Sequence, residues 1–270
     1  MKKYKGDYME DILNHFVNMY IQKNNIKGLP NVRISIVNNI YDEYIKTEND
    51  KWKINEIKKQ KDIIENNNGM IAYPNKLHDF FIIFISEEEV LKSKENGMLV
   101  ICTLWHELTH IIDYQNFVNE FNNGNFENIE NTKNYMGFYF WTEYNAKKIS
   151  YRMYKDFAWQ GQSKSEKSLE HIKNIELPFQ NEVLRKELII HEKNFRQQIY
   201  LIIHYLARYS VWEELDYNYY SEGRQFPYWL NGICNNKLLN LYNLFLKLNS
   251  FDIAKKNFDK IIEYINTLNN

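Results

Sequence analysis

The chain has 270 residues, of which 44% are hydrophobic, 16% aromatic and 26% charged, and its formal net charge is −1. This composition is typical of a globular protein. It excludes an intrinsically disordered chain and argues against a dedicated nucleic-acid binder, which would carry a basic excess. Two cysteines, Cys102 and Cys234, without a CxxC motif argue against a disulfide framework and favour a reducing compartment. The N-terminus reaches the acidic "GDYMED" without an apolar run, and the runs "FFIIFIS" and "MLVICTLW" are too short to span a bilayer. We therefore expect a cytoplasmic protein that binds neither nucleic acid nor membrane.

The first elements predicted along the chain are a helix and three short strands. Apolar residues at helical spacing predict a helix over about 8–23, and "VRISIV" over 32–37 alternates as a half-buried strand does. The charged, asparagine-rich segment 44–68 is interpreted either as a partly helical insertion or as a mobile loop. "GMIAYP" (69–74) and "FFIIFIS" (80–86) predict two strands of a hairpin, joined by the polar "NKLHD".

From Ser86 onward the pattern is helical. Ser86 precedes "EEEVLKSK", which predicts an N-capped helix with acidic residues in its first turn. A long helix over about 97–119 and a second over about 135–157 follow, separated by a polar segment. Further helices are predicted over about 165–175, 180–215, 232–248 and 251–268, with breaks at Pro178 and in "YNYYSEGRQFPYW". These elements predict a mostly helical α+β fold, with a small β-sheet packed on the two long helices and a helical C-terminal half.

The stretch "TLWHELTHIIDY" contains the motif that carries chemistry. His106 and His110 are four residues apart on the 97–119 helix, so both imidazoles leave one face and suit two ligand positions of a tetrahedral Zn²⁺. Glu107 points to the side of that face, where it can act as general base on a water molecule without binding the metal. The alternative is a helix that carries two histidines and a solvated glutamate by chance. The apolar residues around the motif favour the zinc site over a solvent-facing charge cluster.

A catalytic zinc needs a third protein ligand, and we expect Glu143 in "FWTEYNAKK" to be that ligand. The longer signature HExxHxxGxxH is absent, because the chain has Asp113 and Asn116 where glycine and histidine would stand. Glu143 lies on the next long predicted helix, and the small Ala146 one turn later would allow that helix to approach closely. The alternative for Glu143 is an exposed ion pair with Lys147 on the same helix.

Two further residues lie on the histidine face of the 97–119 helix. Asp113 is one turn beyond His110, where it could orient that imidazole as a hydrogen-bond acceptor, bind zinc itself or remain a surface charge; we favour the orienting role. Cys102 is one turn before His106 and is interpreted as a small buried residue, although a thiolate could bind zinc.

Hydrolysis of a peptide bond at a zinc site also needs a hydrogen-bond donor that stabilises the oxyanion of the tetrahedral intermediate. The stretch "YLIIHYLARYS" contains candidates for this donor. His204 is our candidate catalytic residue there, with Tyr205 and Arg208 as alternatives. A histidine on an apolar helix can also be a core residue whose ring is satisfied by hydrogen bonds.

The chain resembles the zincin metallopeptidases of the gluzincin type. "HELTH" matches their helix of two ligands and a base, and "TEYNA" is similar to their glutamate helix. The sheet, the HExxH helix and the ExxA helix, over about residues 32–157, are similar to the ImmA/IrrE-like proteins of phages and mobile elements. The resemblance implies Zn²⁺ as cofactor, peptide hydrolysis and a protein target such as a regulator. Many gluzincins carry an acidic residue four positions after the glutamate ligand, where this chain has Lys147, and Asp113 is the candidate substitute.

These observations lead to the hypothesis of a zinc metallopeptidase that acts on a protein or peptide. In this hypothesis residues 1–160 form the zincin-like catalytic domain and 161–270 a helical C-terminal subdomain. An extended substrate is expected to add as a strand to the sheet near Phe80 to Ser86. The main rival is a zinc-stabilised regulatory or binding protein of a phage or mobile element without peptidase activity. A third hypothesis, an interaction protein without metal, holds only if zinc is absent.

Overall fold

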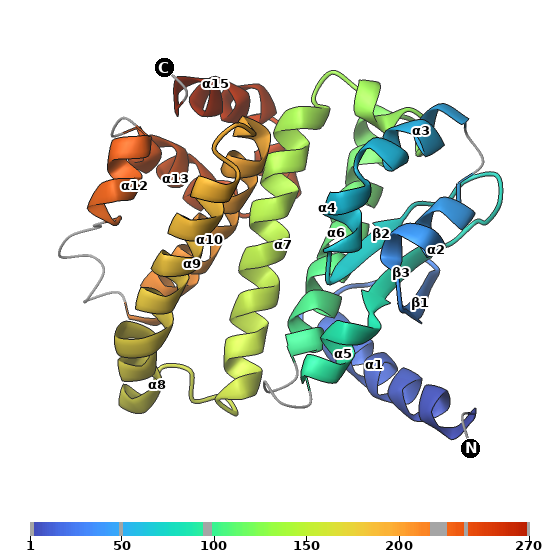
Figure 1. Cartoon of the computed structure of the whole chain (residues 1–270), viewed down its shortest axis with the longest axis horizontal. Coiled ribbons are helices and arrows are strands. Elements are labelled where there is room, and N and C mark those ends of the chain that lie inside the picture. Colours follow the sequence, from blue (N-terminus) through green and yellow to red (C-terminus); the bar gives the residue numbers. More distant parts are fainter. Residues whose placement is uncertain (1–2, 49–50, 94–98, 217–225, 235–236, 269–270) are drawn as a thin grey trace. The chain divides into compact units, whose positions relative to one another are not determined.

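The computed structural model describes residues 3–48, 51–93, 99–216, 226–234 and 237–268 (Figure 1). The backbone divides into two compact units, Met1–Ile129 and Glu130–Asn270. The first unit contains a small sheet with helices, and the described part of the second is helical, which confirms the predicted mostly helical α+β fold. The division into functional halves at residue 160 stays a prediction.

The first unit is built on a mixed sheet of the three predicted strands: β1 (Val32–Val37), β2 (Gly69–Ala72) and β3 (Phe81–Ser86). The strand order is β1-β3-β2, with β1 parallel and β2 antiparallel to β3. The first five side chains of the central strand β3 are buried, which explains its uninterrupted apolar sequence. Strand addition near Phe80 to Ser86 is therefore wrong, because β3 is already paired on both sides.

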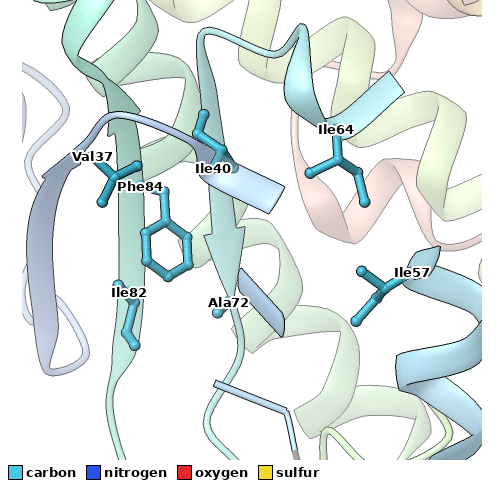
Figure 2. Packing of buried hydrophobic residues seen from close by; sticks show 7 residues of the cluster. All are labelled: Val37, Ile40, Ile57, Ile64, Ala72, Ile82 and Phe84. Carbon is cyan, nitrogen blue, oxygen red and sulfur yellow. The ribbon is translucent and has the colours of Figure 1, made fainter. Parts of the chain in front are cut away.

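Three short helices cover one face of this sheet: α2 (Ile40–Lys46), α3 (Lys51–Lys59) and α4 (Lys61–Glu65). Figure 2 shows the core cluster beneath them, which consists of Val37, Ile40, Ile57, Ile64, Ala72, Ile82 and Phe84. The charged segment 44–68 is thus helical over most of its described length. It is anchored because Ile57 and Ile64 turn their apolar side chains toward the sheet.

The alternate residues of β3 face α6 (Leu99–Phe121), the helix that carries both motif histidines. Phe81, Ile83 and Ile85 are at most 1% exposed, and α6 packs against β2 and β3. α5 (Glu87–Ser93) and α1 (Lys3–Lys23) also contact α6. The predicted cap of α5 is confirmed, since Ser86 Oγ accepts a hydrogen bond from the Glu89 N–H at 3.1 Å.

The second unit is a set of helices. η1 (Ile129–Asn131) lies at the junction, and the unit continues with α7 (Tyr135–Ala158), α8 (Glu166–His171), the π-helix η2 (Ile172–Glu176), α9 (Leu177–Ile190), α10 (Phe195–Leu215), α12 (Tyr228–Ile233), α13 (Leu238–Lys247), α14 (Phe251–Ala254) and α15 (Phe258–Leu268). α7 packs most extensively against α10, and α15 also packs on α7 (Figure 1). Part of the predicted break "YNYYSEGRQFPYW" falls outside the described residues.

Several predicted helix boundaries in this unit are wrong. The helix expected over 251–268 is divided into α14 and α15. The helix expected over 180–215 is two helices, because the chain turns at residues 191–194 and Asn194 caps α10 by accepting from the Gln197 N–H at 3.1 Å. Pro178 does not separate helices but lies in the first turn of α9, where its missing N–H is tolerated. Before it, the Leu177 N–H bonds to the Ile172 carbonyl in the wider π pattern.

Buried tryptophans in the second unit have partners for their N–H groups. Trp141 Nε1–H donates to the Leu248 carbonyl at 3.0 Å, and Trp212 Nε1–H donates to the Tyr151 hydroxyl at 2.8 Å. These bonds remove the cost of burying a polar donor in an aromatic core.

We predict that Gly137→Ala destabilises the second unit. A Cβ on Gly137 would overlap the Phe258 carbonyl oxygen, a backbone atom that cannot turn away as a flexible side chain can. The strain of overpacking should lower the free energy of unfolding by about 1–3 kcal/mol, measured by urea denaturation. Gly232→Ala is the matched control, because nothing lies within 4 Å of its added Cβ. Equal stability of the two variants would show that α7 and α15 do not approach so closely.

Candidate metal centre

α6 brings the imidazoles of His106 and His110 together. Their Nε2 atoms lie 2.9 Å apart, and the two rings meet at an interplanar angle of 89°. Two nitrogen ligands of one tetrahedral zinc ion, each about 2.0–2.1 Å from the metal, are roughly 3.3 Å apart. The spacing of the pair is therefore close to the spacing that a shared ion requires.

Contacts on a different face of α6 set the rotation of this helix. Trp105 is fully buried, and its Nε1–H donates to the Phe16 carbonyl of α1 at 3.0 Å. Thr109, which lies between the two histidines, donates to the Trp105 carbonyl at 2.8 Å, and its Oγ1 is also 2.8 Å from the Tyr20 hydroxyl. Packing against α1 therefore fixes the direction in which the histidine face of α6 points.

The side chain of Glu107 is held against the first residue of β2. Glu107 is 6% exposed, and a Cβ added to Gly69 would lie 3.0 Å from Glu107 Oε1 and 2.5 Å from Thr103 Cγ2. The strand thus approaches α6 more closely than a larger residue at position 69 would allow. The sequence identifies Gly69 only as the start of a strand. The close approach of β2 to α6 cannot be predicted from the residues around Gly69, because the two segments are far apart in the chain.

Glu143 lies on α7, and its carboxylate is bound by His204 of α10. His204 Nε2 and Glu143 Oε2 are 2.9 Å apart, and each side chain is 12% exposed. Burial lowers the pKa of His204 to about 4; the charges of Lys147 and Arg208 add to this effect, and Glu143 opposes it. His204 is therefore neutral at pH 7, and its Nε2–H donates the hydrogen bond to the carboxylate.

His106, His110 and Glu143 form a group that could hold a metal ion. Each offers one ligand atom, and these atoms all lie within 4.8 Å of one another. Glu143, the residue expected as third ligand, is thus a member of the group. Two imidazole nitrogens and a carboxylate oxygen suit zinc and other first-row transition metals. The geometry supports a metal site without specifying which metal.

The other two residues on the histidine face are not members of this group. Asp113 is 4% exposed. Burial of the Tyr20 hydroxyl is the main cause of its raised pKa; the hydrogen bond with Thr109 opposes the shift, and the charge of Asp113 adds to it. The role of Asp113 in orienting His110 stays a prediction. Cys102 is a free, partly exposed thiol rather than the buried residue expected.

The residues considered as oxyanion donors have partners within the second unit. The Tyr205 hydroxyl donates to Asn181 Oδ1 at 2.9 Å, and the charge of Arg208 acts on both His204 and Glu176. Together with the bond from His204 to Glu143, these contacts provide a role within the fold for each of the three. Their proposed contact with a substrate stays a prediction.

No protein-family model matches the chain, and no curated protein or solved structure is significantly similar to it. The resemblance to zincins therefore rests on "HELTH" and "TEYNA" and on the group of His106, His110 and Glu143. Among the described residues, no helix combines the length and the apolarity needed to cross a lipid bilayer.

We predict that Gly69→Ala strains the contact between β2 and α6. The added Cβ would displace Thr103 and Glu107, so the free energy of unfolding should fall by about 1–3 kcal/mol in urea denaturation. Gly28→Ala is the control in the same unit, since its added Cβ meets nothing within 4 Å. A stability of Gly69→Ala equal to that of Gly28→Ala would contradict the close contact.

Proposed function

We propose that the chain is a zinc-dependent metallopeptidase that hydrolyses peptide bonds in a protein or peptide. The observation that carries this proposal is the group of His106, His110 and Glu143, with the buried carboxylate of Glu107 directly after the first histidine. Two imidazoles and one carboxylate are the ligands of a catalytic zinc that keeps its fourth position for water or substrate. A site that only stabilises a fold is usually closed by a fourth protein ligand.

The proposed reaction assigns one task to each residue. When bound, zinc supplies Lewis-acid activation of water and of the substrate carbonyl. Glu107 accepts a proton from the water molecule as the water oxygen attacks the carbonyl carbon. Glu107 then gives that proton to the leaving amine. His106 and His110 are neutral ligands, and Glu143 contributes one negative charge, so the divalent ion keeps a net positive charge toward the substrate.

We propose that the substrate binds along β2 rather than β3. In the described sheet β2 is an edge strand, and Gly69 at its start lies against Glu107. An extended peptide that pairs with β2 would run beside the general base, and main-chain hydrogen bonds would hold it. The likeness to ImmA/IrrE-like proteins supports a regulatory protein of a phage or mobile element as the target.

Two other functions use the same ligands. A zinc-stabilised regulatory protein would need the metal but no base, and two histidines with a carboxylate also bind iron in non-haem oxygenases. The position of Glu107 favours hydrolysis, because neither alternative has a use for a buried carboxylate directly after a ligand.

Metal analysis tests the site itself. We expect about one zinc per chain, measured by mass spectrometry on protein purified without added metal, and a marked loss in Glu143→Ala. Glu170→Ala, an exposed position in the same unit, should keep the zinc. Iron in place of zinc would contradict the proposal. Full zinc retention in Glu143→Ala would move the third ligand elsewhere, with Asp113 as the first candidate.

Replacement of the base tests the reaction. In Glu107→Gln, cleavage of a mixture of quenched fluorescent peptides should fall by roughly 100-fold or more with the zinc content unchanged, because a general base contributes about 10²–10⁴ in rate. Glu120→Gln, at an exposed position of the same helix, should cleave at the wild-type rate. Undiminished cleavage by Glu107→Gln would show that Glu107 is not the general base. Zinc-loaded wild type that cleaves no peptide would favour the binding protein.

A further inference from the structure

The sequence suggests His204 as a hydrogen-bond donor to the substrate, but in the structure its partner is Glu143. Its Nε2 lies 2.9 Å from Glu143 Oε2, and both side chains are 12% exposed. A hydrogen bond to an ionised carboxylate is stronger than one between neutral groups, and exclusion of water strengthens it further. The Nε2–H of His204 is therefore committed to Glu143.

Contacts on both sides of this pair hold α7 and α10 in one register. One turn before Glu143, the Arg196 guanidinium lies 4.9 Å from the centre of the Tyr139 ring. Two turns after Glu143, the Trp212 Nε1–H donates to the Tyr151 hydroxyl at 2.8 Å. Because both helices are fixed at these points, the helices themselves place the His204 ring opposite the carboxylate.

The His204 ring is also restrained from its own helix. Tyr200, one turn earlier on α10, has its ring centre 4.1 Å from that of His204, with an interplanar angle of 42°. A ring that is packed on one side and hydrogen-bonded at Nε2 has little freedom to turn toward another partner. Its effect on the site is therefore exerted through the carboxylate of Glu143.

We propose that His204 is a positioning residue that holds the carboxylate of Glu143 in the orientation in which it binds zinc. The inference rests on the proposed metallopeptidase site and assigns the residue that prepares its third ligand. A glutamate side chain has three rotatable bonds, and a free one would lose that freedom when the metal binds. The hydrogen bond from His204 removes much of this freedom beforehand.

The test is the zinc dissociation constant of metal-free protein, measured by competition with a chromogenic chelator. Loss of a hydrogen-bond partner of a metal ligand typically weakens binding about 10- to 100-fold, and we expect His204→Ala to show a loss of that size. His204→Gln should recover most of the affinity, since its amide N–H can reach the same carboxylate oxygen. His191→Ala, at a partly exposed histidine of the same unit, is the control and should leave affinity unchanged.

A double variant separates positioning from a general effect on the fold. If His204 acts through Glu143, then Glu143→Ala with His204→Ala should bind zinc no more weakly than Glu143→Ala alone. Additive losses would overturn the inference, as would failure of His204→Gln to rescue binding. Unchanged affinity in His204→Ala with a lower kcat would also overturn it and return His204 to the role of substrate donor.

The same measurements separate this inference from the proposed function. If Glu143→Ala weakens zinc binding and His204→Ala does not, the metal site stands and the positioning role fails. If Glu143→Ala itself leaves zinc binding unchanged, the proposed third ligand fails first. The melting temperature of each metal-free variant shows whether the fold is intact, and His204→Gln covers the case in which His204→Ala does not fold.

Discussion

The rotation of α6 about its own axis is the constraint on which the candidate metal centre depends. A helix turns by about 100° per residue, so a rotation of α6 by one residue would turn the face shared by both histidines in a different direction. Burial of Trp105 and its bond to the Phe16 carbonyl prevent such a rotation, and the contact of Thr109 with Tyr20 adds a second restraint. The direction in which the histidine pair faces thus follows from the burial of neighbouring residues on the same helix.

The two carboxylates of the site are held in different ways. Glu107 is confined by space, because the glycine at the start of β2 allows the strand to lie against it. Glu143 is oriented by a directed hydrogen bond from His204. This difference suits their proposed tasks: a general base must reach a water molecule, and a ligand must present a lone pair in a fixed direction.

Under the proposed function, the hydrogen bond between His204 and Glu143 gives the helical second half a role. The role of residues 161–270 could not be read from the sequence, in which they have no recognisable motif. In the structure α10 supplies the partner of Glu143, and both residues belong to the compact unit 130–270. The aromatic core of this unit, with Trp212 bonded to Tyr151, keeps α7 and α10 in register. The second unit can therefore be understood as the support of the proposed third ligand.

The sequence by itself determined the elements whose signal is local. Alternating or continuous apolar residues located all three strands, and the four-residue spacing of His106 and His110 defined a shared helix face, because strand and helix periods depend only on neighbouring residues. Tertiary structure alone decided that β3 is central, that Gly69 must be small and that His204 bonds to Glu143. Each of these depends on two segments far apart in the chain. Their contact is determined by how whole helices and strands bury their apolar faces, which no local pattern records.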